Sequence, residues 1–181
     1  MPGLSPPQHT PEDRSQNLIA SGRRVIELEQ QAVSALVERL DDRFLKACEL
    51  MLGCKGRIVV TGIGKSGHVA GKIAATLAST GTPAFYVHPG DAGHGDLGMI
   101  TRDDLVLALS NSGDSPELLT ILPFLKRQGI PLIALTGNPQ SALARQAEVI
   151  LDTSVTEEAC PLGLAPTSST TASLVMGDAL A

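Results

Sequence analysis

Residues 105–117 read LVLALSNSGDSPE, and this stretch decides the fold. Five apolar residues are followed by a loop of small polar residues, and an apolar helical pattern runs from Leu118 to Leu125. The pattern predicts a buried strand, a loop and the start of a helix. A helix N-terminus presents unpaired backbone N–H groups and a partial positive charge, so such a loop is suited to bind an anion.

The loop carries side chains for two kinds of chemistry. Four of them could surround a phosphate: Ser110, Asn111, Ser112 and Ser115. Glu117 would then be free for proton transfer. A simpler interpretation is a well-capped turn, with Ser115 as N-cap, Pro116 in the first helical position and Glu117 in the first turn. This stretch alone leaves both interpretations open, and it assigns no role to Asp114.

Composition argues against several classes of function. The chain has 181 residues, a net charge of −5 and no run of lysine and arginine, so neither nucleic acid nor an anionic membrane is an expected partner. Aromatic residues make up only 2% of the sequence, which argues against base-stacking platforms. Any site for an anionic ligand must therefore be local.

The sequence also favours a reducing compartment. Its cysteines are odd in number and lack CxxC spacing, which argues against a disulfide framework or a zinc knuckle: Cys48, Cys54 and Cys160. No apolar run approaches the roughly 20 residues of a membrane span. Residues 1–10 lack the apolar centre of a signal peptide. We therefore expect a cytoplasmic protein.

The N-terminal part is predicted to be helical. Residues 1–14 are expected to form a disordered tail and residues 15–53 a helical segment, because apolar residues recur at intervals of three and four from Gln16 to Leu52. Asp41-Asp42 predicts a break before a second helix from Phe44. The first helix is apolar on much of its surface, so it could pack against another subunit or on its own sheet.

Strands and helices then alternate. The predicted strands are 57–61, 83–87, 105–110, 131–136 and 149–151, and the predicted helices are 68–79, 117–128, 141–146 and 168 to the end. This alternation predicts an α/β fold, with a five-stranded parallel sheet in a flavodoxin-like three-layer α/β/α sandwich. In the expected strand order, 2-1-3-4-5, ligands bind at the carboxyl ends of strands 1 and 3. The two loops richest in glycine and serine follow those strands, which favours a functional role for residues 110–117.

The other of these loops, residues 62–67, has the sequence GIGKSG. It resembles a dinucleotide fingerprint, but the expected acidic residue about 20 positions further on is missing, because the second strand ends at Val87-His88-Pro89. A P-loop is excluded as well, since Val59 stands where its first glycine is required. The remaining interpretation is that Ser66 and nearby amides help hold a phosphate. Lys65 would either reach the same crevice or be a solvated lysine of the first turn.

Two further segments contain polar clusters. The glycine-rich loop 88–96 holds His88 and His94, whose six-residue spacing across glycines is only a weak signal for a metal. The block 157–171 combines the pair Glu157-Glu158 with a hydroxyl-rich helix start, where Thr167, Ser168 or Ser169 is expected to act as the N-cap.

These motifs together resemble a known family. The runs GIGKSGHVAGKIAATLASTGTPAFYVHPGDAGHGDLGM, SNSGDSPE and EEACPLGLAPTSSTTASLVMGDALA look like the sugar-isomerase (SIS) domain of D-arabinose 5-phosphate isomerases. The resemblance covers nearly all of residues 16–181 and assigns residues 54–181 to the SIS domain. It implies interconversion of D-ribulose 5-phosphate and D-arabinose 5-phosphate for the synthesis of Kdo, a lipopolysaccharide sugar. It also implies a homotetramer without an organic cofactor.

The resemblance also implies roles for individual residues. Lys65, Glu117 and Glu158 match catalytic positions. Further positions match substrate contacts: Ser66, Gly81, Thr82, His88, His94, Ser110, Asn111, Ser112 and Ser115. His88 also matches a position that can contact an inhibitory zinc. Family members carry a further catalytic histidine and two CBS domains beyond the end of this sequence, so we expect the chain to be part of a longer protein.

Aldose–ketose isomerisation moves a proton between C1 and C2, which requires a base at the carbon and a donor near the oxygen. Our hypothesis assigns the carbon-bound proton to Glu117, stabilisation of the enediolate oxygen to Lys65, and ring opening or proton shuttling to Glu158. The alternative is a non-catalytic sugar-phosphate sensor, because other SIS domains serve in transcriptional regulators. A dehydrogenase is a more distant alternative.

Overall fold

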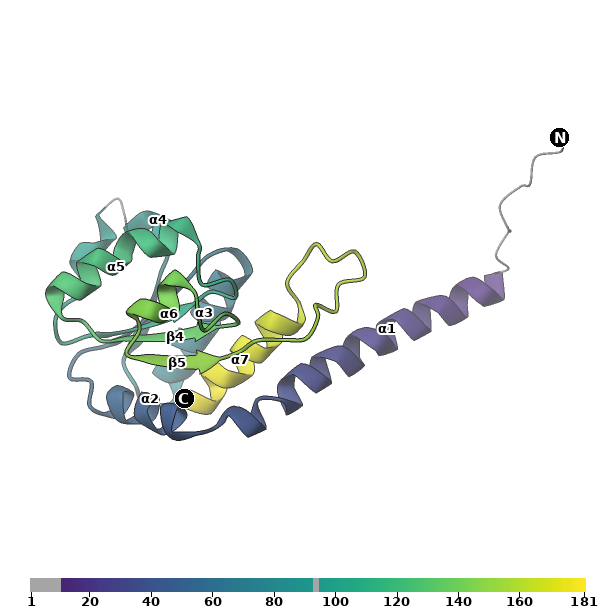
Figure 1. Cartoon of the computed structure of the whole chain (residues 1–181), viewed down its shortest axis with the longest axis horizontal. Coiled ribbons are helices and arrows are strands. Elements are labelled where there is room, and N and C mark those ends of the chain that lie inside the picture. Colours follow the sequence, from purple (N-terminus) through teal and green to yellow (C-terminus); the bar gives the residue numbers. More distant parts are fainter. Residues whose placement is uncertain (1–10, 93–94) are drawn as a thin grey trace.

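The computed structural model describes residues 11–92 and 95–181, which form a three-layer α/β/α sandwich with one projecting helix (Figure 1). The parallel strands are β1 (Ile58–Gly62), β2 (Ala84–Val87), β3 (Leu105–Leu109), β4 (Leu132–Thr136) and β5 (Val149–Asp152). Their order in the sheet is β2-β1-β3-β4-β5. The predicted fold class and strand order are therefore confirmed.

The helices flank and follow these strands. The longer ones are α1 (Pro11–Ser34), α2 (Asp42–Leu52), α3 (Gly64–Ser79), α5 (Pro116–Gln128) and α7 (Ser168–Leu180). The shorter ones are η1 (Val37–Arg39), α4 (Pro89–Ala92), η2 (Asp96–Met99) and α6 (Ala142–Gln146). The predicted break at Asp41-Asp42 is present, and the Asp41 side chain caps α2 by accepting from the Arg43 amide at 2.9 Å.

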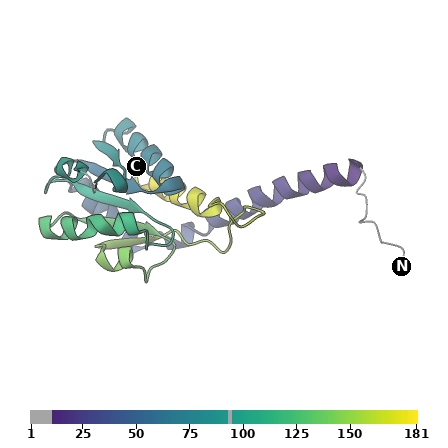
Figure 2. The same cartoon turned by 90° about the horizontal axis from the view of Figure 1, so that it is seen from above.

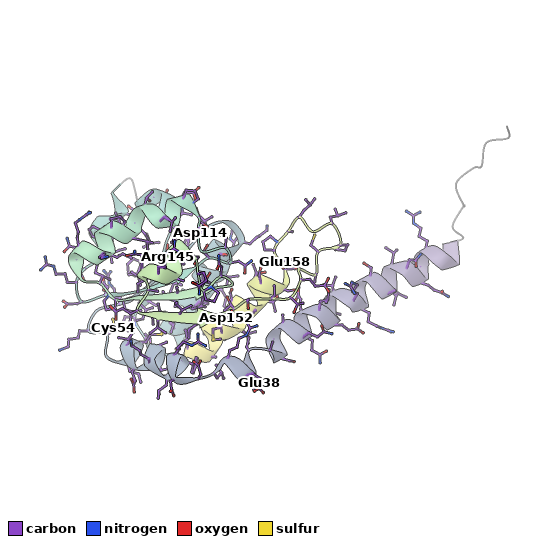
Figure 3. The ribbon with its side chains drawn as sticks, viewed as in Figure 1. Glu38, Cys54, Asp114, Arg145, Asp152 and Glu158 are labelled. Atoms are coloured by element: carbon purple, nitrogen blue, oxygen red, sulfur yellow. The ribbon has the colours of Figure 1, made fainter. Side chains whose placement is uncertain are left out.

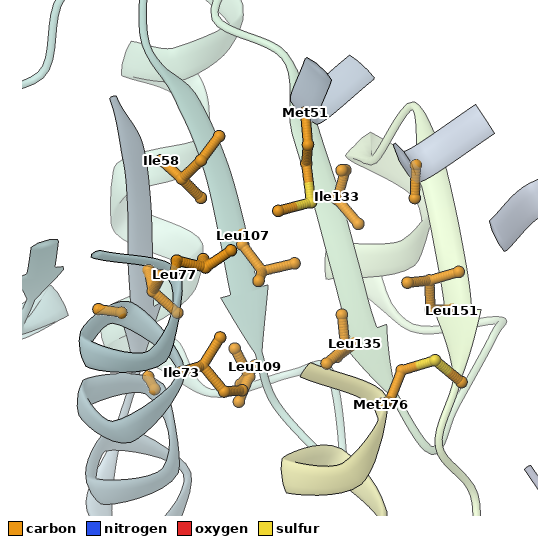
Figure 4. Packing of buried hydrophobic residues seen from close by; sticks show 14 of the residues in the cluster. Met51, Ile58, Ile73, Leu77, Leu107, Leu109, Ile133, Leu135, Leu151 and Met176 are labelled. Atoms are coloured by element: carbon orange, nitrogen blue, oxygen red, sulfur yellow. The ribbon is translucent and has the colours of Figure 1, made fainter. Parts of the chain in front are cut away.

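Successive side chains of a strand point to opposite faces, and this alternation builds two cores. On one face, Leu105, Leu107 and Leu109 of β3 pack with α2, α3 and α7 (Figure 4). On the other face, Val106 and Ala108 pack with α5 and neighbouring elements. Because both faces are covered, the central strands are apolar at nearly every position. Polar loops therefore lie at the carboxyl edge of the sheet, which the helices do not cover.

Helix α1 packs along α7, and its N-terminal part extends away from the sandwich (Figures 1 and 2). Three apolar side chains on it are exposed: Leu18, Ile19 and Ile26. Contacts that tie α1 to the body include Arg24 with Glu157 at 3.0 Å, and Glu29 with the Thr171 hydroxyl at 3.1 Å. In the part of the chain that the structure describes, no helix is both long and apolar enough to cross a membrane.

Three predictions differ from the structure. Helix α3 begins at Gly64, four residues before the predicted start at His68, because the positive φ of Gly64 lets the chain turn into the helix directly after β1. The tail expected over residues 1–14 is helical from Pro11 onwards, because α1 begins there, while residues 1–10 lie outside the described range. The segment 88–96 was expected to be a loop, but Pro89–Ala92 form α4 and Asp96 begins η2. Proline is favoured at the first position of a helix, and Pro89 occupies that position in α4. The many glycines of this segment favoured the prediction of a loop instead.

Candidate active site

A cavity of about 270 Å³ lies at the carboxyl edge of the sheet. Three segments line it: Ile63, Lys65 and Ser66 at the start of α3; Leu109–Ser112 and Ser115 between β3 and α5; and Pro166, Ser169, Thr170 and Ser173 at the start of α7. The N-terminal ends of three long helices therefore meet at one cavity. The helix dipoles, together with the unpaired first amides of α3 and α5, make it suited to an anionic ligand.

We call residues 110–115 the cradle, and their polar groups are partly ordered by one another. The Ser110 hydroxyl accepts from the Gly113 amide at 3.0 Å and lies 3.1 Å from the Ser115 hydroxyl. The Ser112 hydroxyl accepts from the Asp114 amide at 3.3 Å. Gly113 has φ +69°, a conformation that glycine adopts without strain. The cradle thus turns sharply and holds its serines at the cavity.

Ser115 occupies the N-cap position of α5, as predicted. However, the Ser115 side chain makes no capping hydrogen bond; its hydroxyl lies 3.1 Å from the Ser110 hydroxyl instead. The capped-turn interpretation is therefore correct for the backbone and wrong for the side chain. Pro116 has no N–H, so it is the amides of Glu117 and Leu118 that keep their capacity to donate to a ligand.

The glycines of residues 62–67 serve a tight turn. The Tyr86 hydroxyl donates to the Gly62 carbonyl at 2.9 Å, and a Cβ on Gly67 would lie only 2.8 Å from that hydroxyl. Gly64 has φ +56°, which allows α3 to begin directly after β1. This close packing explains the pattern that resembled a nucleotide fingerprint, and it brings Lys65 and Ser66 to the cavity.

Glu158 fixes the start of α7. Its Oε2 accepts from the Thr167 amide at 2.7 Å, from the Thr167 hydroxyl at 3.1 Å and from the Ser169 amide at 3.3 Å. Burial by itself raises the pKa of Glu158, but hydrogen bonds from Ser169 and Thr167 outweigh it, so the pKa lies below its usual value. Thr167 stands at the N-cap position as predicted, yet the capping side chain is Glu158.

The cavity gathers six of the predicted site residues: Lys65, Ser66, Ser110, Asn111, Ser112 and Ser115. Glu117 is exposed at the start of α5, and neither it nor Glu158 lines the cavity. Figure 3 shows Glu158 near the start of α7, apart from Asp114.

The remaining predicted contacts lie elsewhere or cannot be described. Gly81 and Thr82 follow α3, whose 16 residues span about 24 Å, so they lie at the opposite edge of the sheet from the cavity of the same chain. His88 follows β2 at the carboxyl edge, where its Nδ1 accepts from the Gly90 amide at 3.2 Å. His94 lies outside the described residues.

The structure adds three hydroxyl residues to the cavity: Ser169, Thr170 and Ser173. The sequence favours a capping role for this segment, from Thr167, Ser168 or Ser169, over a binding role. Positions 169 and 173 are four residues apart, and 170 and 173 three apart, so they share a helix face. This spacing, together with the position of the helix after β5, is the sequence feature that could have predicted these three residues as part of the cavity.

Within the described ranges, no group of three or more His, Cys, Asp and Glu side chains could hold a metal ion. Because His94 is not described, the zinc contact expected at His88 stays a prediction. The three cysteines are all free thiols.

Comparison with known proteins identifies the family. Residues 51–181 match the SIS domain. The chain belongs to the SIS domain family. The arabinose 5-phosphate isomerase KdsD of Pseudomonas aeruginosa is 66% identical over 169 residues, covering 92% of this chain and 52% of the relative. KdsD of Escherichia coli K12 is 57% identical, covering 89% of this chain and 49% of the relative. The SIS chain thus spans about half the length of these curated relatives.

A solved structure agrees with this assignment. The c3406 protein of Escherichia coli CFT073, determined in complex with arabinose 5-phosphate, superposes with a TM-score of 0.87 at 42% sequence identity. The match covers 91% of this SIS chain and 88% of that chain. The resemblance inferred from the motifs is therefore confirmed at the level of the family.

Proposed function

We propose that this SIS domain interconverts D-ribulose 5-phosphate and D-arabinose 5-phosphate. One observation carries the proposal: a single cavity holds Lys65, Ser66 and the serines of the cradle, at the meeting point of three helix N-termini. Two comparisons favour this substrate among sugar phosphates. The sequence is 66% identical to an arabinose 5-phosphate isomerase, and the fold is similar to that of a structure with bound arabinose 5-phosphate. Such an enzyme would supply the Kdo branch of lipopolysaccharide synthesis in the cytoplasm.

In the proposed complex, the phosphate binds in the cradle. Ser112 and Ser115 donate hydroxyl hydrogens to it, and the free amides of α5 add donors aligned with the helix dipole. Ser169, Thr170 and Ser173 line another part of the cavity, where the Thr170 and Ser173 hydroxyls can bind sugar hydroxyls. The phosphate thereby fixes the position of the carbon chain.

The proton transfer needs a carboxylate and a cation. Lys65 lines the cavity and stabilises negative charge on the enediolate oxygen. Glu117 follows the cradle by two residues at the start of α5, and we assign the carbon-bound proton to its carboxylate. Glu158 is engaged by the first amides of α7 and its pKa is lowered, which favours a supporting role over proton shuttling.

Neither an organic cofactor nor a metal is required by this chemistry. We also propose that the protein assembles as a homo-oligomer, because apolar side chains of α1 are exposed on its projecting part. A tetramer is the specific expectation.

The decisive experiment incubates the protein with ribulose 5-phosphate and detects arabinose 5-phosphate by chromatography. Turnover that persists in a chelator supports a metal-independent isomerase. Tight binding of arabinose 5-phosphate without any turnover, also in a chain extended beyond residue 181, would instead identify a sugar-phosphate sensor. Absence of both turnover and binding would contradict the proposed function.

A further inference from the structure

Asp114 is the one ionisable residue of the cradle, and it does not line the cavity. Its Oδ1 accepts from the backbone amide of Ala142, the first residue of α6, at 2.9 Å. A carboxylate aimed into the cavity would repel a phosphate. Instead, the charge of Asp114 lies at the N-terminal end of α6, where it is favourable.

Further contacts join the cradle to α6 in the same place. The Gly113 carbonyl accepts from the Leu143 amide at 3.0 Å, and the Ser141 hydroxyl accepts from the Ala144 amide at 3.3 Å. With Asp114, the first three amides of α6 are therefore all satisfied, two of them by the cradle. A Cβ on Gly113 would overlap the Ser141 hydroxyl, so the two segments pack in close contact here.

A second attachment holds the other end of the cradle. The Asn111 carbonyl accepts from the Gly137 amide at 3.0 Å and from the Thr136 hydroxyl at 3.4 Å. Thr136 is fully buried at the end of β4. The cradle is thus fixed on both sides of Ser112, which lines the cavity between the two attachments.

We propose that Asp114 is a positioning residue that holds the cradle in its phosphate-binding conformation by anchoring it to α6. The inference rests on the proposed function, since it concerns how the same site binds its sugar phosphate. The Asp114 amide donates to the Ser112 hydroxyl at 3.3 Å, so release of Asp114 from α6 displaces Ser112 directly. The anchor therefore acts on substrate affinity more than on the chemical step.

Two substitutions separate the hydrogen bond from the charge. Asp114→Ala removes the acceptor and leaves the Ala142 amide unpaired, whereas Asp114→Asn keeps an acceptor oxygen and removes the charge. Asp41→Ala is the control, because the Asp41 carboxylate also accepts from a backbone amide at a helix start and α2 does not line the cavity. All three variants are compared with wild type for KM, kcat and melting temperature.

We expect Asp114→Ala to raise KM for arabinose 5-phosphate about tenfold, as for an unpaired amide, with kcat changed less than about threefold. Asp114→Asn should restore KM to within about twofold of wild type, and Asp41→Ala should lower the melting temperature without changing KM. An unchanged KM in Asp114→Ala, or an Asn variant as impaired as the Ala variant, overturns the proposal.

Hydrogen exchange gives a readout that is independent of turnover. Asp114→Ala should accelerate exchange of the Gly113 and Leu143 amides, and Asp114→Asn should leave it near wild type. Equal protection in both variants overturns the anchor even if the protein binds no sugar phosphate. If hydrogen exchange shows the expected difference between the two variants but the protein binds no sugar phosphate, only the proposed function is contradicted.

Discussion

The carboxylate of Glu158 and the backbone amide of Thr167 are joined by a hydrogen bond of 2.7 Å, so a loop side chain caps the helix that supplies part of the active-site cavity. The ionised carboxylate also accepts from the Thr167 hydroxyl and the Ser169 amide. A charged acceptor with several donors is among the stronger caps available to a helix. This cap stabilises the protein in a pH-dependent manner.

Glu158→Gln is expected to lower the free energy of unfolding by about 1 kcal/mol at neutral pH, because a neutral amide is a weaker cap than a carboxylate. The folded pKa of Glu158 is lowered, so its contribution is present above the unfolded pKa of about 4.3 and is lost as the pH falls through the folded pKa. The difference between wild type and variant, measured by urea unfolding, should therefore shrink from pH 7 towards pH 3.

Glu157→Gln is the control for this measurement. Glu157 pairs with Arg24 at the surface, where both side chains are at least half exposed, so its loss should change stability by less than about 0.5 kcal/mol. A Glu158→Gln variant with full stability at pH 7 would contradict the capping role.

Glu117→Gln should abolish isomerisation while leaving the affinity for arabinose 5-phosphate within about threefold, because the amide keeps the shape of the side chain and cannot accept the proton. Turnover and calorimetric binding are measured on the same preparation. Glu38→Gln is the control, since Glu38 is an exposed first-turn glutamate of η1 that does not line the cavity. Undiminished turnover in Glu117→Gln would eliminate Glu117 as the base.

Ser112→Ala should weaken binding of arabinose 5-phosphate about tenfold, because a hydroxyl donor to a charged phosphate is lost. Binding is compared with that of unphosphorylated arabinose. The matched control is Ser79→Ala, whose hydroxyl donates to the Ala75 carbonyl at 2.9 Å near the far end of α3. If wild type binds both sugars equally well, the cradle does not recognise the phosphate.

Leu18, Ile19 and Ile26 are each about two-thirds exposed on α1. Replacing all three by Gln should reduce the molar mass measured by light scattering. The substitution removes the apolar surface whose burial between copies would favour association. Arg23→Gln, an exposed polar position on the same helix, should leave the mass unchanged. A monomeric wild-type protein would contradict the proposed assembly.

The strand order and the cradle were predictable because they depend on local patterns. Strands buried on both faces are read as continuous apolar runs, such as residues 105–109, and the alternation with helices then restricts the topology. The topological rule for parallel sheets places the loops after β1 and β3 at one edge. The serines of the cradle and Lys65 follow from that placement.

Other features depend on contacts between distant residues, which local periodicity does not encode. Glu158 reaches the amides of Thr167 and Ser169 across an irregular loop, so the sequence suggested a carboxylate pair and a separate hydroxyl cap. The Asp114 carboxylate accepts from the Ala142 amide, which belongs to a different strand–helix unit. No local pattern in the sequence indicates this contact. Such long-range polar contacts are what the three-dimensional structure adds.

The meeting of three helix N-termini at one cavity has a consequence for how binding responds to acidity. The dipoles of α3, α5 and α7 are fixed by the backbone and do not titrate, so their attraction depends on the charge of the ligand. A phosphate ester loses its second proton near pH 6, so its dianion fraction falls steeply below that pH. Affinity for the sugar phosphate should therefore weaken in mildly acidic solution as the ligand takes up a proton.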